Sequence, residues 1–415
     1  MRIAIVGTGV SAMTAAYLLS PRHDITVFVK ADYIGGHTNT LDIEIEGTTY
    51  PVDTGFIVFN DWTYPNFIKL LDTLGVESRA STMSFSVACD RTGLEYNGGS
   101  LTGLFAQKRN LVSPKFLRML RDILKFNTLA KRFAIAGDDD TTMQDFAEQH
   151  GLGEMFYDKY LTPIAASIWS ADPQKVARFP MRFMAQFFRN HGMLNVWDRP
   201  QWRTVVGGSR SYMSALTGPF ADRIRLSEAV TSVRRFEQHI ELDTERETNQ
   251  PFDHVVLGCH SDQALAILGE DASDDERAAL SSIPYQPNLA ILHTDERSLP
   301  SRRSCWAAWN YRVPEAKGRP VILTYNMNIL QGLDTPQTLC VTLNDEDGIA
   351  AEKIIAKVPY EHPVFVPERK TAHDLFDKIN HRNRTSFCGA YWRFGFHEDG
   401  VVSALNAVKP FGVSL

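Results

Sequence analysis

The chain begins MRIAIVGTGVSAMTAAYLLS at residues 1–20, and this stretch decides its fold. Residues 3–6 form a short apolar run rich in β-branched side chains, which is typical of a strand buried in a parallel sheet. A GxGxxA motif follows at once. Gly7 permits a tight turn, Gly9 lets the backbone approach a pyrophosphate, and Ala12 allows a helix to pack closely on the strand. A helix predicted over 11–20 and a second strand over 24–29 complete a βαβ unit. Because the N-terminus of such a helix attracts phosphate, we predict that a dinucleotide contacts Gly7, Gly9, Val10, Ser11 and Ala12.

One part of this unit departs from the usual pattern. The second strand commonly ends in Glu or Asp, whose carboxylate accepts hydrogen bonds from the adenosine ribose. Here Val29 stands at that position, and Lys30 follows it. Because a valine side chain accepts no hydrogen bond, the sequence predicts weaker nucleotide binding or ribose contacts from elsewhere.

Composition and charge narrow the class of protein. The 415 residues suffice for two or three packed units, and a net charge of −6 argues against a general nucleic-acid binder. The five cysteines are scattered and form no CxxC pair, which favours reduced thiols and indicates no metal site. The glycine motif leaves no room for a signal peptide before it, and no apolar run reaches the roughly 18 residues of a membrane span. We therefore expect a cytoplasmic protein.

Two further glycine segments make the pattern more specific. Ile34-Gly35-Gly36-His37 follows the second strand, and Asp53-Thr54-Gly55-Phe56 follows a short hairpin. Together with the opening motif, they resemble the amine oxidase and phytoene desaturase superfamily of flavoproteins, although that superfamily often carries Arg where His37 stands. The resemblance implies non-covalent FAD and an α/β fold, in which a Rossmann-like FAD-binding domain of the amine oxidase type is interleaved with an α+β substrate domain. The cofactor contacts that it implies in these segments are Gly35, Gly36, His37, Gly55 and Phe56.

Later segments match the superfamily in the expected order. Residues 202–210 read WRTVVGGSR, 253–259 read DHVVLGC, and 386–400 read SFCGAYWRFGFHEDG before a helix predicted over 401–408. The start of that helix would direct backbone amides at the flavin ring. The later cofactor contacts implied by the resemblance are Val230, Gly389, Gly400 and Val401.

The same resemblance implies a discontinuous domain organisation. The FAD-binding domain would be assembled from residues 1–60, 201–260 and 376–415. The two insertions, 61–200 and 261–375, would form the substrate domain.

Three phrases in the insertions point to a substrate class: PIAASIWS at 163–170, NHGML at 190–194 and TYNMN at 324–328. They resemble a bacterial subgroup of predicted NAD/FAD-binding proteins that is often encoded beside cyclopropane-fatty-acid-synthase-like methyltransferases. This resemblance implies a dehydrogenase or desaturase acting on a methylated fatty acyl chain of a lipid, with hydride transfer to flavin N5.

The residue that takes the proton in such a reaction stays open. The side chains in or beside these motifs that can accept or relay a proton are His191, His397, Glu398, Tyr325 and Asp198. Each also has a purely structural interpretation. A His beside a Gly often only packs in a turn, and Glu398 is placed to cap the following helix.

Three other functions also stay open. A flavin amine oxidase would need a compact aromatic pocket, and often a Lys beside the flavin. A flavin-dependent isomerase would share every motif above. Val29 leaves room for a degenerate, non-redox flavin-binding protein. The oligomeric state does not follow from the sequence.

A basic stretch stands out in this acidic chain. Residues 104–136 carry eight basic side chains and one acidic side chain, Asp122. The apolar residues between them have a spacing that fits an amphipathic helix. Two interpretations stand equal: a solvated face of the substrate domain, or a helix that lies on the anionic inner face of a membrane.

Overall fold

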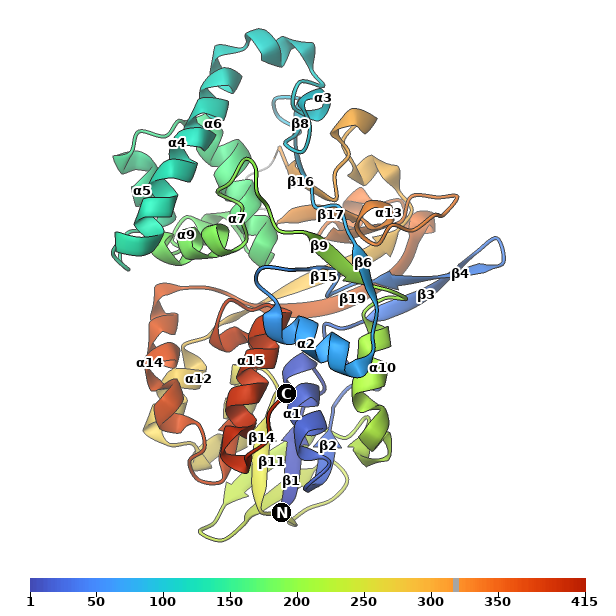
Figure 1. The fold of residues 1–415 in the computed structure, drawn as a ribbon, viewed down its shortest axis with the longest axis vertical. Helices are drawn as coiled ribbons and strands as arrows, with labels where there is room; N and C mark the ends of the chain where they lie inside the picture. The colour runs from blue at the N-terminus through green and yellow to red at the C-terminus, as the bar shows by residue number, and fades with distance from the viewer. Residues whose placement is uncertain (316–320) are drawn as a thin grey trace.

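The parallel sheet predicted from the opening motif is the centre of one domain. The computed structural model describes residues 1–315 and 321–415. The sheet has the order β10-β2-β1-β14-β20, and its strands pair in parallel throughout. Its strands are β1 (Arg2–Val6), β2 (Asp24–Phe28), β10 (Ile224–Arg225), β14 (His254–Leu257) and β20 (Thr385–Phe387). Segments from the start, middle and end of the chain therefore meet in one sheet, of which Figure 1 labels β1, β2 and β14.

Alternate residues of β1 face two separate cores, as the pleat of a strand requires. Ile3 and Ile5 lie in a core that four helices cover, whereas Ala4 and Val6 lie in a core on the opposite face of the sheet. Both faces are apolar because both are covered, which explains the unbroken apolar run. The helices of the first core are α1 (Val10–Leu19), α2 (Pro65–Leu74), α10 (Arg210–Thr217) and α15 (His397–Val408). Those of the second core are α11 (Ser261–Leu268), α12 (Asp274–Ser281) and α14 (Lys370–Ile379).

Two helices from the predicted insertions pack against the parallel sheet. Residues 61–200 were expected in the substrate domain, but Phe67 and Leu70 of α2 are buried in the first core. Residues 261–375 were expected there too, but Leu280 of α12 belongs to the second core. An amphipathic helix shows which of its faces is buried, yet its sequence does not show which core that face joins.

The second domain contains a mixed sheet of order β19-β15-β18-β17-β16-β7-β8. β7 and β16 pair in parallel, and the other neighbouring strands are antiparallel. Its strands are β7 (Phe85–Cys89), β8 (Leu94–Asn97), β15 (Tyr285–His293), β16 (Trp309–Val313), β17 (Ile322–Asn326), β18 (Cys340–Leu343) and β19 (Ile354–Pro363). Figure 1 shows this sheet and its neighbouring helices above the parallel sheet.

The helical part of this domain is built around α4 (Pro114–Ala136), which is capped by the Ser113 hydroxyl and starts with a proline. Its buried residues, including Phe116, Phe126 and Ala130, join the core of the mixed sheet. The other helices are α3 (Leu101–Leu104), α5 (Met143–Gln149), α6 (Glu154–Phe156), α7 (Thr162–Trp169), α8 (Pro173–Val176), α9 (Met181–Asn190) and α13 (Met327–Leu330), with a π-helical turn at Tyr157–Leu161.

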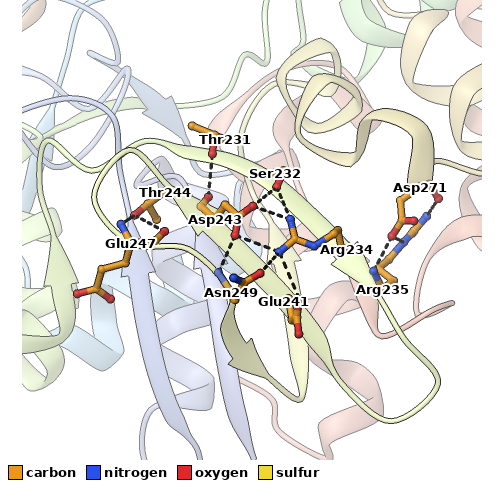
Figure 2. A network of polar contacts seen from close by, with 10 residues as sticks. All are labelled: Thr231, Ser232, Arg234, Arg235, Glu241, Asp243, Thr244, Glu247, Asn249 and Asp271. Carbon is orange, nitrogen blue, oxygen red and sulfur yellow. Dashed lines mark hydrogen bonds and ion pairs between the residues drawn. The ribbon is translucent and has the colours of Figure 1, made fainter.

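Three small sheets complete the fold. The strands are β3 (Thr40–Ile45) with β4 (Thr48–Asp53), then β5 (Phe59–Asn60), β9 (Trp202–Val205) and β6 (Ser78–Ala80), and last β11 (Val230–Arg235), β12 (Ile240–Thr244) and β13 (Gln250–Phe252). Arg234 and Asp243 join β11 to β12 through an ion pair of 2.6 Å, and the backbone N–H of Asn249 donates to the same carboxylate (Figure 2). This network lowers the pKa of Asp243, chiefly through the bond from Arg234. It fixes the sheet whose first strand begins at Val230.

Among the described residues, no helix has both the length and the apolar character needed to cross a membrane.

Candidate active site

A cavity of about 1040 Å³ extends from the parallel sheet to the mixed sheet. Its wall on the first domain consists of the glycine segments and the ends of β1 and β2. Its wall on the second domain is mostly aromatic and aliphatic. One continuous space therefore connects the predicted dinucleotide motif with the substrate domain.

The opening motif adopts the shape that its glycines predict. Gly7 has φ +103°, and a Cβ there would lie 2.9 Å from the carbonyl oxygen of Gly258. Gly9 caps α1, and a Cβ there would have nothing within 4 Å, because this position faces the cavity. Val10 and Ser11 line the cavity as well. Ala12 does not: it packs against Gly258, where an added Cβ would lie 2.6 Å from the Ala12 Cβ.

The second glycine pair lies directly on the first motif. Gly35 has φ +124° and donates its N–H to the Thr8 hydroxyl over 3.3 Å. A Cβ on Gly36 would lie 3.6 Å from the Cα of Gly9. Gly55 is equally constrained, since its Cβ would lie 2.3 Å from the carbonyl oxygen of His37. These contacts place two cavity-facing backbone segments side by side, as a diphosphate requires.

His37 lies in this cradle as a neutral imidazole. It stacks on Tyr360 at 4.7 Å between ring centroids and lies 5.0 Å from the ring of His362. Burial, followed by the neighbouring His362, lowers the pKa of His37 well below its usual value. Its buried Nε2 has no hydrogen-bond partner among the described residues. A buried polar atom without a partner fits a site that is completed by a bound group.

The nucleotide end of the cavity is formed by Val29, Lys30 and Val230. Val29 follows β2 directly, and its backbone N–H donates to the carbonyl oxygen of Arg225. Since Val29 lines the cavity, we expect an acidic side chain at this position to reach the same space.

The Val29→Glu variant should therefore bind FAD about tenfold more tightly than the wild type. A carboxylate that accepts hydrogen bonds from the ribose contributes about 1.5–3 kcal/mol. The dissociation constant would be measured by titrating the apoprotein and following flavin fluorescence. Val29→Leu, which stays apolar, is the control and should leave the affinity unchanged. Equal affinity of Val29→Glu and Val29→Leu would show that the ribose lies elsewhere.

The C-terminal motif lines the cavity in part. Gly389 is in the wall, and a Cβ there would lie 2.1 Å from the ring of Tyr391. Gly400 and Val401, which were expected to contact the cofactor, are not in the wall. A Cβ on Gly400 would lie 2.6 Å from Val10, so Gly400 brings α15 close to α1. The helix begins four residues earlier, with His397.

His397 lies in the cavity wall, but its ring is held by contacts with other side chains. Its ring stacks on Phe56 at 3.4 Å between centroids, and its Nε2 lies 3.1 Å from the Thr38 hydroxyl and 2.9 Å from the Tyr212 hydroxyl. Burial lowers the pKa of His397 to about 3. These contacts orient the ring and leave Nε2 no freedom to take a proton from a substrate.

Glu398 does not reach the cavity wall. Its carboxylate accepts hydrogen bonds from the backbone N–H groups of Asn66 and Phe67 and from the Asn66 amide. It therefore caps the N-terminus of α2, a helix distant in sequence, and the structure does not support the predicted role as a proton acceptor. Asp198 is exposed and also lies outside the wall.

His191 and Tyr325 both line the cavity. His191 Nδ1 lies 3.0 Å from the carbonyl oxygen of Phe187. Because a carbonyl only accepts, Nδ1 carries the proton and Nε2 keeps its lone pair. Burial lowers the pKa of His191 to about 4. Burial raises the pKa of Tyr325, whose ring meets Trp309 edge to face at 5.2 Å.

Sequence reasoning did not single out Arg199, an exposed residue that also lines the cavity. Its charge lowers the pKa of the cavity-lining Tyr160, against the larger effect of burial. Tyr360 and His362, which pack on His37, were also not identified from the sequence. All three lie in irregular or strand segments without a recognisable motif.

A glycine-rich phosphate cradle on a parallel sheet, opening into an aromatic cavity, defines a flavoprotein. Residues 13–409 match the family described as flavin containing amine oxidoreductase, and the chain belongs to this family. The protein is accordingly an FAD-dependent oxidoreductase.

Solved structures share this fold over nearly the whole chain. Cyclohexylamine oxidase from Brevibacterium oxydans IH-35A is 15% identical, with a TM-score of 0.72, and the match covers 99% of this chain and 98% of that one. A CLA-producing fatty acid isomerase from P. acnes is 16% identical, with a TM-score of 0.66 and the same coverage. Putrescine oxidase bound to putrescine is 12% identical, with a TM-score of 0.68 over 99% of both chains. No curated protein matches this chain by sequence.

Proposed function

We propose that this oxidoreductase is a dehydrogenase or desaturase that removes two hydrogens from a fatty acyl chain of a lipid, with a methylated chain as the preferred substrate. The observation that carries the proposal is the character of the cavity wall in the substrate domain. Arg199 is the one charged residue among the described lining residues between 81 and 202 and between 309 and 325. The apolar part of this wall includes Met83, Phe85, Tyr96, Tyr160, Ile164, Ile168, Trp169, Phe187, Met193, Trp202, Trp309 and Tyr325.

Such a wall suits an alkyl chain. Burial of each CH₂ group contributes about 0.8 kcal/mol, so a chain of several carbons is held without polar contacts. An alkylammonium ion would be desolvated in the same space, and the one carboxylate among the described lining residues, that of Glu361, lies 3.6 Å from His260. Arg199 is exposed at the edge of the wall, where its guanidinium would hold the carboxylate or phosphate at the polar end of the substrate.

FAD would be held by the cavity-facing residues of the glycine segments and by their neighbours. We assign this role to Gly7, Gly9, Val10, Ser11, Gly35, Gly36, His37, Gly55, Phe56, Val230 and Gly389, all of which line the cavity. When bound, FAD supplies the two-electron chemistry that side chains lack. The protein's own part is to exclude water and to align the chain, for which the aromatic wall is suited.

His191 is the best placed proton acceptor. Its Nδ1–H donates to the Phe187 carbonyl, so Nε2 keeps a free lone pair on a residue that lines the cavity. With its pKa lowered to about 4, the ring is neutral at physiological pH and can accept a proton or a hydrogen bond. Tyr325 stays protonated, because burial raises its pKa, and would act as a hydrogen-bond donor.

A fatty-acid isomerase is the second candidate. A fatty acid isomerase shares this fold, and the same apolar wall would serve either reaction. An amine oxidase is less consistent with the wall, since Lys30, at the nucleotide end, is the one lysine among the described lining residues.

The test is anaerobic mixing of the holoprotein with a phospholipid that carries methyl-branched acyl chains. The proposal expects bleaching of the flavin absorbance and an acyl product that has lost two hydrogens, detected by mass spectrometry. The matched control is an unbranched phospholipid of equal chain length, which should bleach the flavin more slowly. An acyl product of unchanged mass would indicate the isomerase, and bleaching by alkylamines alone would indicate the amine oxidase. Either outcome would contradict the desaturase.

A further inference from the structure

The basic stretch of the sequence is exposed from the turn before α4 to the last turns of that helix. Figure 1 shows α3 and the start of α4 at the end of the long axis opposite the N-terminus. The basic side chains of this surface are Lys108, Arg109, Lys115, Arg118, Arg121, Lys125, Lys131 and Arg132, and all are exposed. We propose that this basic surface docks the protein on an anionic lipid bilayer.

Between residues 101 and 136 the exposed charges are all positive. The single acidic residue between 101 and 136 is Asp122, which is buried. Its carboxylate lies 3.6 Å from Arg118 and accepts a hydrogen bond from the Gly153 backbone. The other basic side chains are not neutralised from within their own helix. In a chain with a net charge of −6, they form a local positive field that complements anionic headgroups.

Large apolar side chains are exposed among these charges. Val112 is 79% exposed, Leu101 is 76% exposed and Leu124 is 55% exposed. Leu111, Leu117 and Ile135 are exposed as well. The inner face of α4 fills the core with Phe116 and Phe126, and these outer residues are not part of that core. Basic and apolar residues on one face are the combination by which a helix lies in a membrane interface.

The basic surface also adjoins the cavity. Gly98 and Gly99 line the cavity, and Ser100 next to them caps α3, whose first residue is the exposed Leu101. Tyr96 lines the cavity on one side and meets Phe116 of α4 edge to face at 5.8 Å. One layer of side chains thus separates the cavity from α4. The phosphates of a nucleic acid would contact only the basic side chains, whereas a bilayer would also take up the exposed apolar side chains.

The proposal is tested by sedimenting the full-length holoprotein with vesicles of phosphatidylcholine alone or with a one-third share of phosphatidylglycerol. We expect binding to the anionic vesicles, at least tenfold weaker binding to the neutral ones, and release by salt. The triple variant K108E/K115E/R121E should lose at least about 100-fold in affinity. Arg118 is left intact because it pairs with Asp122. The matched control, K370E/K378E/R382E, reverses three exposed charges in and after α14 and should bind almost like the wild type.

A second variant separates a bilayer from other polyanions. Leu111→Ser with Val112→Ser and Leu117→Ser keeps every charge and should weaken vesicle binding about tenfold. Both variants keep the buried face of α4, and circular dichroism would verify their fold. Equal binding to neutral and anionic vesicles would overturn the proposal. Unchanged vesicle binding of the serine variant would overturn the part of the proposal that places the exposed apolar side chains in the bilayer. Vesicle binding does not depend on which substrate the enzyme oxidises.

Discussion

Gly9→Val should leave the protein folded and lower its affinity for FAD by about 100-fold. A Cβ at Gly9 meets nothing within 4 Å, and φ is −66°, so the folded chain tolerates a side chain there. The space in front of it is the cavity itself, where the backbone of Gly9 and the first turn of α1 face the phosphates. A valine side chain would hold the phosphates away from these N–H groups. Losing one or two charge-assisted hydrogen bonds costs roughly 3 kcal/mol.

The dissociation constant would be measured by fluorescence titration of the apoprotein, and the fold by circular dichroism and urea unfolding. Gly218→Val is the matched control, since a Cβ at Gly218 also meets nothing within 4 Å and this residue lies outside the cavity wall. It should bind FAD like the wild type. Normal FAD affinity in Gly9→Val would mean that the phosphates do not lie at this turn.

The cofactor end of the site could be predicted because its information is local. The spacing of Gly7, Gly9 and Ala12 fixes a turn and a helix within a few residues, and the structure has both, with α1 beginning at Val10. The glycine pair Gly35-Gly36 is also recognisable locally, since both residues have the positive φ angles of sharp turns. The family match over residues 13–409 agrees with the fold class and the cofactor derived from these motifs.

The roles that depend on distant contacts could not be predicted. Glu398 lies beside a helix start in the sequence, but its partners are Asn66 and Phe67, more than 300 residues away. Gly400 faces Val10 instead of the cavity for the same reason. The helix around 401–408 was correctly expected, but a helix sequence does not reveal which residues of its first turn face a ligand. Tertiary packing decides this.

The substrate side of the site was predicted least well. Arg199 lies in an irregular segment between α9 and β9, and no motif marks it. His191 was identified because of the phrase around it, yet the feature that determines its tautomer, the Phe187 carbonyl, follows from α9 ending there. The character of a cavity wall is a property of residues brought together from six or more segments. Composition alone cannot show it.

Asp53→Ala should destabilise the protein by about 3–5 kcal/mol, because Asp53 is the buried acceptor that joins four segments. Its carboxylate accepts hydrogen bonds from the Thr40 hydroxyl at 2.6 Å and from the Ser209 backbone N–H at 2.9 Å. The side-chain amide of Gln331 donates to it as well. Truncation leaves these buried donors without a partner, which costs about 1–3 kcal/mol each where no water can enter. Urea unfolding of the holoprotein at fixed FAD concentration would measure the change.

Asp42→Ala is the control, since Asp42 is paired with Arg210 at 2.7 Å on the surface, where both side chains are half exposed. Such a pair contributes about 0–1 kcal/mol. A cost for Asp53→Ala no greater than that of Asp42→Ala would show that the buried donors find other partners or water.

The pH dependence of the free energy of unfolding is a second, independent test of the role of Asp53. Burial raises the pKa of Asp53 from 3.8 to about 6, against the hydrogen bonds from Thr40 and Ser209 that lower it. Between these two values the unfolded chain has lost the proton and the folded chain still holds it, so the stability of the wild type falls as the pH rises from about 4 to 6. The shift of about two units corresponds to roughly 3 kcal/mol. Asp53→Ala lacks this contribution, so its cost relative to the wild type should be larger at pH 4 than at pH 7. A cost that grew with pH instead would mean that the folded protein favours the ionised carboxylate, contrary to its burial.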